Sequence, residues 1–228
     1  MIIEHRYLPN KDSSASSGTY NVQFMPFRSS TNGMRVLTWW RDACLESCEL
    51  KPEEGKCGDQ KYLDDWTERF PCVHVLQHLG GGVAPWNIEQ YTFSAAQAGV
   101  SGIRKADRLR FPLIFYHFHA LRFYDRYLIE PTGAQYVFDK SALQLIYIPY
   151  ILHLTSVATR LRQRGLAFDP HGVKPARWHN RARVWIIFWL RTLLRRNNQS
   201  GANHKITVLG AKITAFARSS ALKQVHMF

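Results

Sequence analysis

The sequence predicts an α/β fold: a mixed sheet with helices, followed by a helical, basic C-terminal extension. A hydrophobic content of 46% with seven Trp residues is typical of a chain with a packed core. Charge divides the chain, because residues 151–228 contain 14 Lys and Arg residues and one acidic residue, whereas residues 1–150 contain 16 of each kind. The net charge of +13 therefore lies in the last third. We expect a body at 1–125 and a basic helical tail at 126–228, which meet different partners.

The first half of the body is predicted to hold one strand and two helices. Residues 20–27 (YNVQFMPF) are typical of a buried strand. Residues 31–50 are predicted to form a helix, because apolar residues recur at three- and four-residue steps. A second, short helix is expected to begin with Asp59 as its N-cap and to end at Pro71. Its inward face would consist of Tyr62, Leu63, Trp66 and Phe70. Residues 73–76 alternate like a short strand.

Later in the chain, residues 95–110 are polar and basic and are interpreted as a connection. Residues 111–119 (FPLIFYHFH) are rich in aromatic and β-branched side chains and predict a strand. Helices are expected at 141–163, with a kink at Pro149, and at 176–196. No stretch is read as a membrane span, which takes roughly 18–20 apolar residues.

The four cysteines, Cys44, Cys48, Cys57 and Cys72, lie close together in the sequence. Their spacing lacks the paired C-x2-C pattern of structural zinc sites. Reduced, half-buried thiols in a cytosolic protein are therefore favoured over a zinc site.

Residues 57–87 carry most of the candidate site. Asp59 and Gln60 are the candidate catalytic residues, since a carboxylate and an amide at a helix start can bind sugar hydroxyls or stabilise positive charge; judged on position alone, a plain helix cap is favoured. A run of three glycines leaves backbone N–H groups able to meet phosphate oxygens, unless it is simply a loop with positive φ angles. The candidate substrate-binding residues here are Gly80, Gly81, Gly82, Trp86 and Asn87.

Three histidines are candidate metal ligands. His117 and His119 are two residues apart at the end of a predicted strand, and this spacing puts both on one face. His78 lies just before the glycines. A structural role is the alternative for each.

In this order the segments resemble the C-terminal half of a GT-A glycosyltransferase of the family-8 type. Tyr20-Asn21-Val22-Gln23 stands for the F-N-x-G strand of that family, with Gln23 in place of glycine. Asp59-Gln60 stands for its D-Q pair, and residues 115–118 (FYHF) for its strand ending in His-Phe. The strings DQKYLDDW, APWN and FYHFH are similar to those of bacterial proteins regarded as glycosyltransferases. The likeness covers residues 20–124 and fades beyond them.

The resemblance implies a nucleotide-sugar donor, a glycan or lipid-linked acceptor, and Mn²⁺ or Mg²⁺ bridging the donor diphosphate. It puts Asp59 and Gln60 beside the transferring sugar, Asn21 and the glycines along the substrate cleft, and Trp86 on a sugar face. His117 is the favoured metal ligand. His78 is the alternative, if the family pattern H-x-x-G-x-x-K-P-W is laid on residues 78–86, where Ala84 replaces the lysine.

The D-x-D motif of GT-A enzymes, which belongs to their donor-binding half, does not occur in these 228 residues. We therefore expect a truncated form or one half of a split enzyme, with little independent activity.

The basic tail contains residues 177–196 (RWHNRARVWIIFWLRTLLRR), whose Trp and Arg content is typical of a helix in a membrane interface. Packing on the body and nucleic-acid binding are the less favoured alternatives. Without a visible secretory signal, the expected location is cytoplasmic, at the inner face of the membrane. The sequence thus predicts a glycosyltransferase-like protein; the alternative is a non-catalytic sugar- or membrane-binding scaffold.

Overall fold

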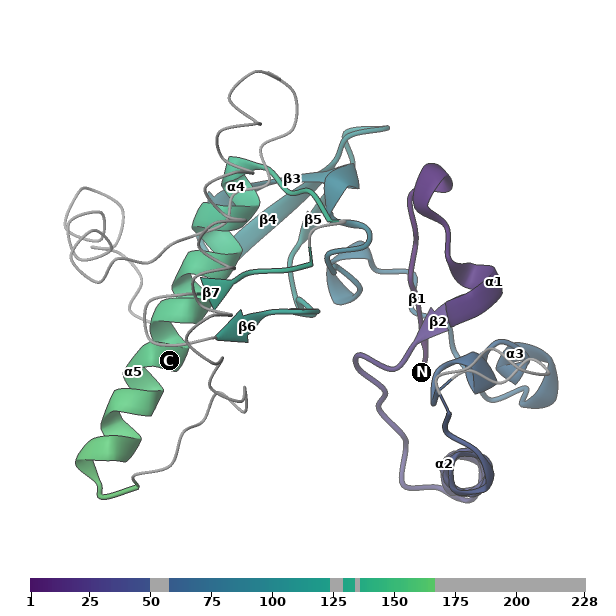
Figure 1. Cartoon of the computed structure of the whole chain (residues 1–228). Coiled ribbons are helices and arrows are strands. Elements are labelled where there is room, and N and C mark those ends of the chain that lie inside the picture. The colour runs from purple at the N-terminus through teal and green to yellow at the C-terminus, as the bar shows by residue number, and fades with distance from the viewer. Residues whose placement is uncertain (50–57, 124–128, 134–135, 167–228) are drawn as a thin grey trace, which may run out of the picture. The chain divides into compact units, whose positions relative to one another are not determined.

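The computed structural model describes residues 1–49, 58–123, 129–133 and 136–166, which combine helices with small antiparallel sheets (Figure 1). The chain divides into two compact units. The first unit comprises Met1–His117 and Phe138–Ile146, and the second comprises Phe118–Val137 and the chain from Tyr147 onward. Helices and sheets are both present, as an α/β class requires. Within the described residues the named strands pair only in antiparallel fashion, in three small sheets.

The elements have the following bounds. The strands are β1 Ile3–Glu4, β2 Tyr20–Asn21, β3 Tyr91–Ala96, β4 Gly99–Arg104, β5 Arg110–Pro112, β6 Arg122–Phe123 and β7 Ile129–Glu130. The helices are α1 Ser14–Ser17, α2 Thr31–Glu46, α3 Trp66–Arg69, α4 Lys140–Ala142 and α5 Ile148–Gln163. Short 3-10 turns lie at Pro9–Lys11, Lys61–Leu63, Leu79–Gly81 and Ile88–Gln90.

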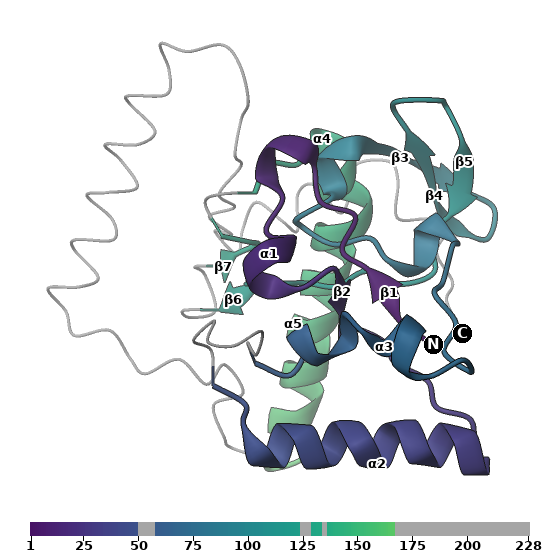
Figure 2. The same cartoon turned by 90° about the vertical axis from the view of Figure 1, so that its right-hand side faces the viewer.

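Helix α2 confirms the helix predicted at 31–50, but it ends four residues earlier, at Glu46. The hydroxyl of Ser30 caps it by accepting a hydrogen bond from the Gly33 N–H at 3.3 Å. Figure 2 shows α3 lying beside α2, and the two share an aromatic core. The buried members of that core are Ile2, Val36, Leu63, Trp66 and Phe70. The inward face predicted for residues 62–70 is therefore confirmed for Leu63, Trp66 and Phe70, while Tyr62 is partly buried against the same core.

The strand predicted at 20–27 is limited to β2, which pairs with β1 through Ile3↔Asn21 and Glu4↔Tyr20. The chain turns after Asn21 because its side-chain Oδ1 accepts the Gln23 N–H at 3.2 Å. Such side-chain turns compete with strand pairing. The strand predicted at 73–76 is likewise reduced to one parallel bridge between Ile2 and Val75.

Strands β3, β4 and β5 form an antiparallel meander, so the prediction of a connection at 95–110 was wrong. Gly99, with φ +115°, follows the tight turn between β3 and β4. Gly102 faces Phe111 across the β4–β5 pair, and a Cβ at Gly102 would lie 2.3 Å from the Phe111 ring. The aromatic ring thus fills the space that glycine leaves open. Gly and Ala in these strands hide the alternation by which strands are recognised in a sequence.

The strand predicted at 111–119 ends at Pro112, which has no N–H to donate to a ladder. Beyond it, Tyr116 makes a single parallel bridge with Val83. His117 and His119 therefore do not lie on a common strand, and they belong to different units.

Residues 140–163 form one helical run, which confirms the helix predicted at 141–163. Asp139 caps it by accepting the Ala142 N–H at 3.0 Å. A π-helical turn, Leu143–Tyr147, precedes Pro149. Proline lacks an N–H and its ring crowds the preceding turn, so the irregularity expected there takes this form.

Among the described residues, the helix Lys140–Gln163 is long and apolar enough, by length and composition, to cross a membrane. The prediction that no stretch is apolar and long enough to span a membrane is therefore wrong for this helix. Core helices of soluble proteins have the same length and composition, so this finding by itself assigns no location. The helix predicted at 176–196 lies outside the described residues.

Candidate functional site

The glycine segment Gly80–Gly82 uses its own backbone amides internally. The Gly80 N–H donates to the His78 ring Nδ1 at 3.1 Å, the Gly81 N–H to the His78 carbonyl at 3.3 Å, and the Gly82 N–H to the Leu79 carbonyl at 3.1 Å. These donors are therefore not available to a phosphate, which corrects the expectation of a phosphate-binding loop. None of the three has a positive φ, so the alternative reading was wrong as well.

The same glycines are required because other parts of the chain approach them closely. A Cβ at Gly80 would lie 1.8 Å from the Pro112 carbonyl oxygen, and one at Gly81 would lie 2.5 Å from Leu76 Cδ2. The Gly80 carbonyl also accepts the N–H groups of Ile114 and Phe115, both at 2.9 Å. The close approach predicted for a ligand is made here by the protein itself.

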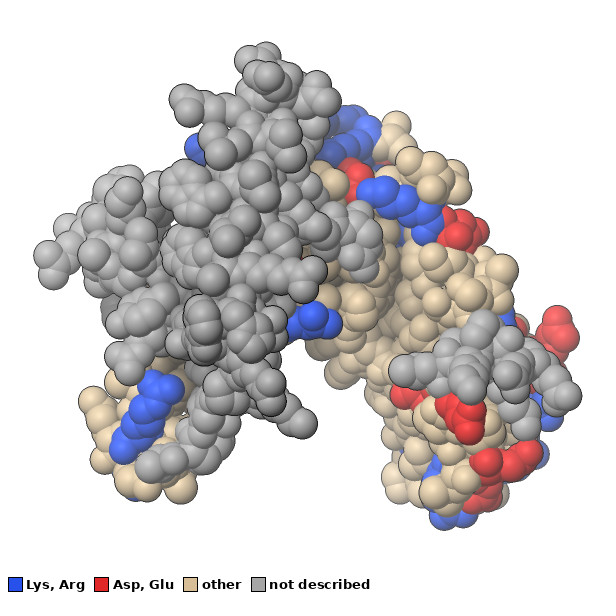
Figure 3. All heavy atoms as spheres, viewed as in Figure 1, with Lys and Arg blue, Asp and Glu red and all other residues tan. Residues whose placement is uncertain are grey.

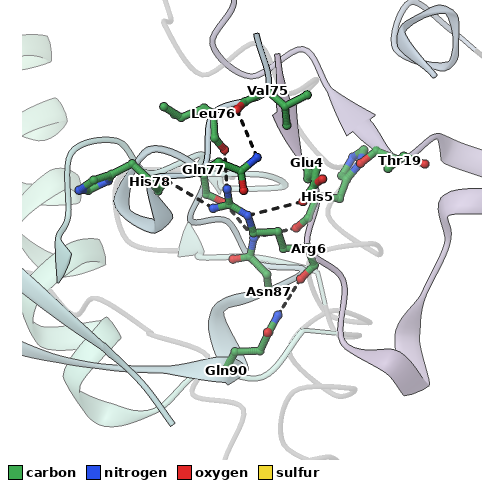
Figure 4. A network of polar contacts seen from close by, with 11 residues as sticks. Glu4, His5, Arg6, Thr19, Val75, Leu76, Gln77, His78, Asn87 and Gln90 are labelled. Atoms are coloured by element: carbon green, nitrogen blue, oxygen red, sulfur yellow. Dashed lines mark hydrogen bonds and ion pairs between the residues drawn. The ribbon is translucent and has the colours of Figure 1, made fainter. Parts of the chain in front are cut away.

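Asn87 is fully buried and bonds to three backbone groups in two segments of the chain. Its Nδ2 donates to the carbonyls of His5 and Gly82, both at 2.8 Å, and its Oδ1 accepts the Ala84 N–H at 3.0 Å. Figure 4 shows it within a network that extends to Gln90, whose Nε2 donates to the Arg6 carbonyl at 2.6 Å. Asn87 was predicted to bind substrate, but its amide is committed to holding the N-terminal segment against the glycine segment.

Arg6 is the second centre of this network. Its Nη2 donates to the Leu76 carbonyl at 2.6 Å and its Nη1 to the His78 carbonyl at 3.4 Å. It adopts φ +51°, which is uncommon for a residue with a side chain. The sequence analysis missed Arg6 because these two hydrogen-bond partners lie 70 and 72 positions away, and nothing in the local sequence signals them.

Trp86 lies between two histidines. Its ring centroid is 5.1 Å from that of His5 and 5.2 Å from that of His117. Trp86 is only 8% exposed, so the neighbours of its ring are protein groups. The structure thus brings together two predicted residues, Trp86 and His117, and adds His5, which was not predicted.

Burial lowers the pKa of His5 to about 4, although its hydrogen bond to the Thr19 carbonyl at 3.2 Å works in the opposite direction. The ring is therefore neutral at physiological pH. It stacks on Tyr7 with ring centroids 4.6 Å apart. A neutral, buried imidazole in an aromatic stack is a structural residue that resists protonation.

The free energy of unfolding is expected to fall as the pH is lowered from 6.5 towards 4. The unfolded chain takes up a proton near 6.5, which the folded His5 accepts only near 4. Linkage gives a loss of roughly 2–3 kcal/mol over this window. Urea unfolding at several pH values, with His5→Phe as the non-titrating variant, measures it. The wild type should lose its advantage over the variant as the pH falls; a constant difference would contradict the prediction.

Asp59 and Gln60 lie in a turn rather than at a helix start. The N-cap residue of the 3-10 turn Lys61–Leu63 is Gln60 and that of α3 is Asp65, and neither side chain makes a capping hydrogen bond. The prediction of Asp59 as a helix N-cap was therefore wrong. The Asp59 carbonyl accepts the Trp40 Nε1–H at 2.9 Å. Its carboxylate lies near Cys44, whose pKa is raised to about 11, first by burial and then by Cys48 and Asp59.

Gln60 contacts the segment Ser17–Thr19, which in turn contacts His5. Its Nε2 donates to the Ser17 carbonyl at 2.7 Å, and the Thr19 carbonyl contacts the His5 ring. The Thr19 N–H in turn donates to Asp64 Oδ1 at 2.8 Å. A short loop of the N-terminal segment therefore connects the D-Q-K-Y-L-D-D-W string to His5, one of the two histidines beside Trp86.

Two side-chain amides beside the glycine segment have atoms without a partner among the described residues. Asn21 is 2% exposed, and its Nδ2 is a buried donor with no acceptor. Gln23 donates weakly to the Gly81 carbonyl at 3.4 Å, while its Oε1 is a buried acceptor with no donor. Next to them, Phe24 is 51% exposed and pairs with Phe115 at a centroid distance of 5.5 Å. Gln23 and both Phe residues were not predicted as site residues.

The predicted metal ligands do not form a group. The His78 ring Nδ1 accepts the Gly80 N–H, His117 packs on Trp86, and His119 packs edge-on against Tyr136 at 5.9 Å. Burial and the nearby Arg122 lower the pKa of His119. In the part of the chain that the structure describes, no three His, Cys, Asp or Glu side chains come together as a metal site. The imidazole donors are also a poor match to Mg²⁺, which prefers oxygen.

The cysteines within the described ranges, Cys44, Cys48 and Cys72, are free thiols. Cys57 lies outside those ranges. The prediction of thiols without a disulfide therefore holds for these three residues, but only Cys44 is half-buried as predicted, whereas Cys48 and Cys72 are exposed.

Comparison with known proteins gives two similar chains from Bacillus subtilis, strain 168. The uncharacterized protein YfnD is 31% identical over 140 residues, which are 60% of this chain and 43% of YfnD. The uncharacterized protein YfnF is 41% identical over 105 residues, which are 46% of this chain and 33% of YfnF. The chain thus spans less than half the length of these relatives. No family model and no solved structure matches.

Proposed function

We propose that this chain is glycosyltransferase-like, with a GT-A-type architecture, and that it takes part in moving a sugar from a nucleotide-sugar donor to a cell-surface glycan or lipid-linked acceptor. Asp59 and Gln60 are proposed to act at the transferring sugar. Because the chain spans less than half of its relatives, the activity of a whole protein of this kind is part of the proposal.

The observation that carries the proposal is the polar and aromatic group formed by Asn21, Gln23, Phe24 and Phe115. One amide atom there lacks an acceptor and another lacks a donor. A hydroxyl group can donate and accept at once, so a polyhydroxylated ligand would satisfy both atoms; because both are buried among the described residues, the segment beside Phe24 has to open to admit it. The exposed Phe24 beside them offers an apolar ring to a sugar face. A few convergent polar groups next to aromatic side chains are typical of small-molecule sites.

The predicted Mn²⁺ or Mg²⁺ stays a proposal for the whole activity. The described residues do not assemble a group that fits such an ion, so no step of the proposed sugar transfer is routed through it. What this chain supplies is orientation: holding a sugar beside Asp59 and Gln60 lowers the entropic part of the barrier.

The anionic membrane surface remains the proposed partner of residues 177–196, and the inner face of the cell membrane the proposed location. Both rest on sequence alone, because these residues lie outside the described ranges. The alternative function is a scaffold that binds sugar or membrane without turnover.

Sugar binding is tested by saturation-transfer NMR on the full chain, with nucleotide sugars and free hexoses as probes. Gln23→Ala and Phe24→Ala are each expected to weaken binding about tenfold, because each removes one direct contact. Gln77→Ala is the matched control, since Gln77 is exposed and bonds only locally to the Val75 carbonyl. If none of these probes binds the folded chain at millimolar concentration, the proposal fails.

Turnover distinguishes the enzyme from the scaffold. Hydrolysis or transfer of the donor is measured with and without Mn²⁺, in the wild type and in Asp59→Asn. An enzyme loses turnover in Asp59→Asn but retains sugar binding. A scaffold, like half of a split enzyme without its donor-binding half, shows no turnover in either form and unchanged binding, so turnover in the wild type is the result that identifies an enzyme.

A further inference from the structure

The turn between β4 and β5, residues 104–110, is held in one conformation by Asp107. Arg104 donates to both carboxylate oxygens of Asp107, at 3.0 and 2.6 Å, and the Leu109 N–H donates to Asp107 Oδ1 at 3.2 Å. The Arg104 N–H reaches the Leu109 carbonyl at 2.9 Å. These contacts lower the pKa of Asp107 to about 2, so the carboxylate stays ionised. The turn is thus preorganised in the isolated molecule.

This rigid turn presents an apolar tip between basic side chains. Leu109 is 48% exposed, and its neighbours Arg108 and Arg110 are exposed as well. Besides Arg108, Arg110 and the paired Arg104, the turn carries Lys105, whose Nζ donates to the Glu89 carbonyl at 2.7 Å. Figure 3 shows Lys and Arg gathered on the part of this face where β3–β5 lie in Figure 1.

The local acidic groups do not neutralise the tip. Asp107 is occupied by Arg104. Glu89, on the neighbouring turn, forms an ion pair with Lys11. Arg108, Arg110 and Lys105 therefore remain as excess positive charge around Leu109.

The backbone conformation of Arg108 also indicates a functional role for this turn. It has φ +62°, a left-handed conformation that glycine or asparagine adopts at lower cost. Residues in such sparsely populated backbone conformations cluster at functional sites. Here the strain orients an arginine next to an exposed leucine.

We propose that the 104–110 turn is a docking element for an anionic lipid surface. Leu109 enters the headgroup and acyl boundary, and Arg108 and Arg110 contact lipid phosphates. Basic side chains gain from the negative surface potential, and an apolar tip gains by leaving water. An aliphatic tip favours lipid over single-stranded nucleic acid, because nucleic-acid sites use aromatic side chains for stacking. This inference is independent of the proposed sugar chemistry and of residues 177–196.

The test is co-flotation of the full chain with phosphatidylcholine vesicles, with and without phosphatidylglycerol, at low and high salt. Arg108→Gln/Arg110→Gln is expected to reduce partition into anionic vesicles roughly 25-fold at low salt, about fivefold for each charge. Leu109→Ser is expected to reduce it about tenfold. Both variants keep the Arg104–Asp107 pair, so circular dichroism and thermal unfolding should match the wild type.

The matched control is Arg28→Gln/Arg41→Gln, which removes the same charge from two exposed positions away from the turn. It should change partition by no more than about twofold, because distant surface charges are screened. All variants retain the basic tail, so any binding by the tail is common to them.

Three results would overturn the proposal: full vesicle binding by Leu109→Ser, equal losses in the control and the turn variant, or unchanged vesicle binding by Arg108→Gln/Arg110→Gln. A labelled oligonucleotide is titrated in parallel. Loss of oligonucleotide binding in the turn variant, with vesicle binding intact, would assign the turn to nucleic acid instead.

Discussion

Replacing Asn87 by Ala is expected to lower the free energy of unfolding by about 4 kcal/mol, because it leaves three buried backbone groups without partners at roughly 1–3 kcal/mol each. Those groups are the carbonyls of His5 and Gly82 and the N–H of Ala84. Asn87 is 0% exposed, so water cannot replace the amide without opening the structure. Chemical denaturation followed by Trp fluorescence measures the loss.

The control for Asn87 is Asn32→Ala. Asn32 is exposed in the first turn of α2, and its replacement should change stability by no more than about 0.5 kcal/mol. If Asn87 instead served a ligand, its replacement would leave stability near that of the control and affect only binding. That outcome would restore the substrate-binding role predicted from the sequence.

Gly80→Ala is expected to cost about 3 kcal/mol or more, since overpacking against rigid neighbours reaches this range. The new Cβ would lie 1.8 Å from the Pro112 carbonyl oxygen, a backbone atom that cannot move aside by changing a rotamer. Shifting it would also disturb the two hydrogen bonds that the Gly80 carbonyl accepts from residues 114 and 115. Thermal unfolding of the full chain measures the effect.

Gly99→Ala provides the contrast for Gly80. Gly99 has open space around its Cα but a φ of +115°, so alanine there is strained without a clash. We expect a cost of about 1–2 kcal/mol. A Gly80→Ala variant as stable as Gly99→Ala would mean that the close approach to Pro112 is not maintained in solution.

The helices were the predictable part of this fold. Residues 31–46 and 140–163 carry apolar side chains at three- and four-residue intervals, and this pattern is local. The inward positions Leu63, Trp66 and Phe70 followed from the same spacing. Strands were less predictable, because their partners are remote: the meander Tyr91–Pro112 is rich in Gly, Ala and Ser, and Phe111 supplies the ring that covers Gly102.

The candidate site was predicted in its residues more than in their roles. Trp86 and His117 do lie side by side. Gln60 is connected through the segment Ser17–Thr19 to His5, which packs on Trp86. The glycine amides and Asn87, however, are used within the protein. Whether Asp59 and Gln60 act on a sugar stays a prediction until turnover and binding are measured.

By itself, the sequence determined the two long helices, Thr31–Glu46 and Lys140–Gln163, and the buried positions Leu63, Trp66 and Phe70. Each of these depends on neighbours a few positions apart. Only the tertiary structure decided that residues 78–90 are held by His5 and Arg6. It also showed that Asn21 and Gln23 each have one buried amide atom without a partner among the described residues, next to the exposed Phe24. The physical reason is that hydrogen-bond partners seventy or more residues apart leave no periodic pattern in either segment.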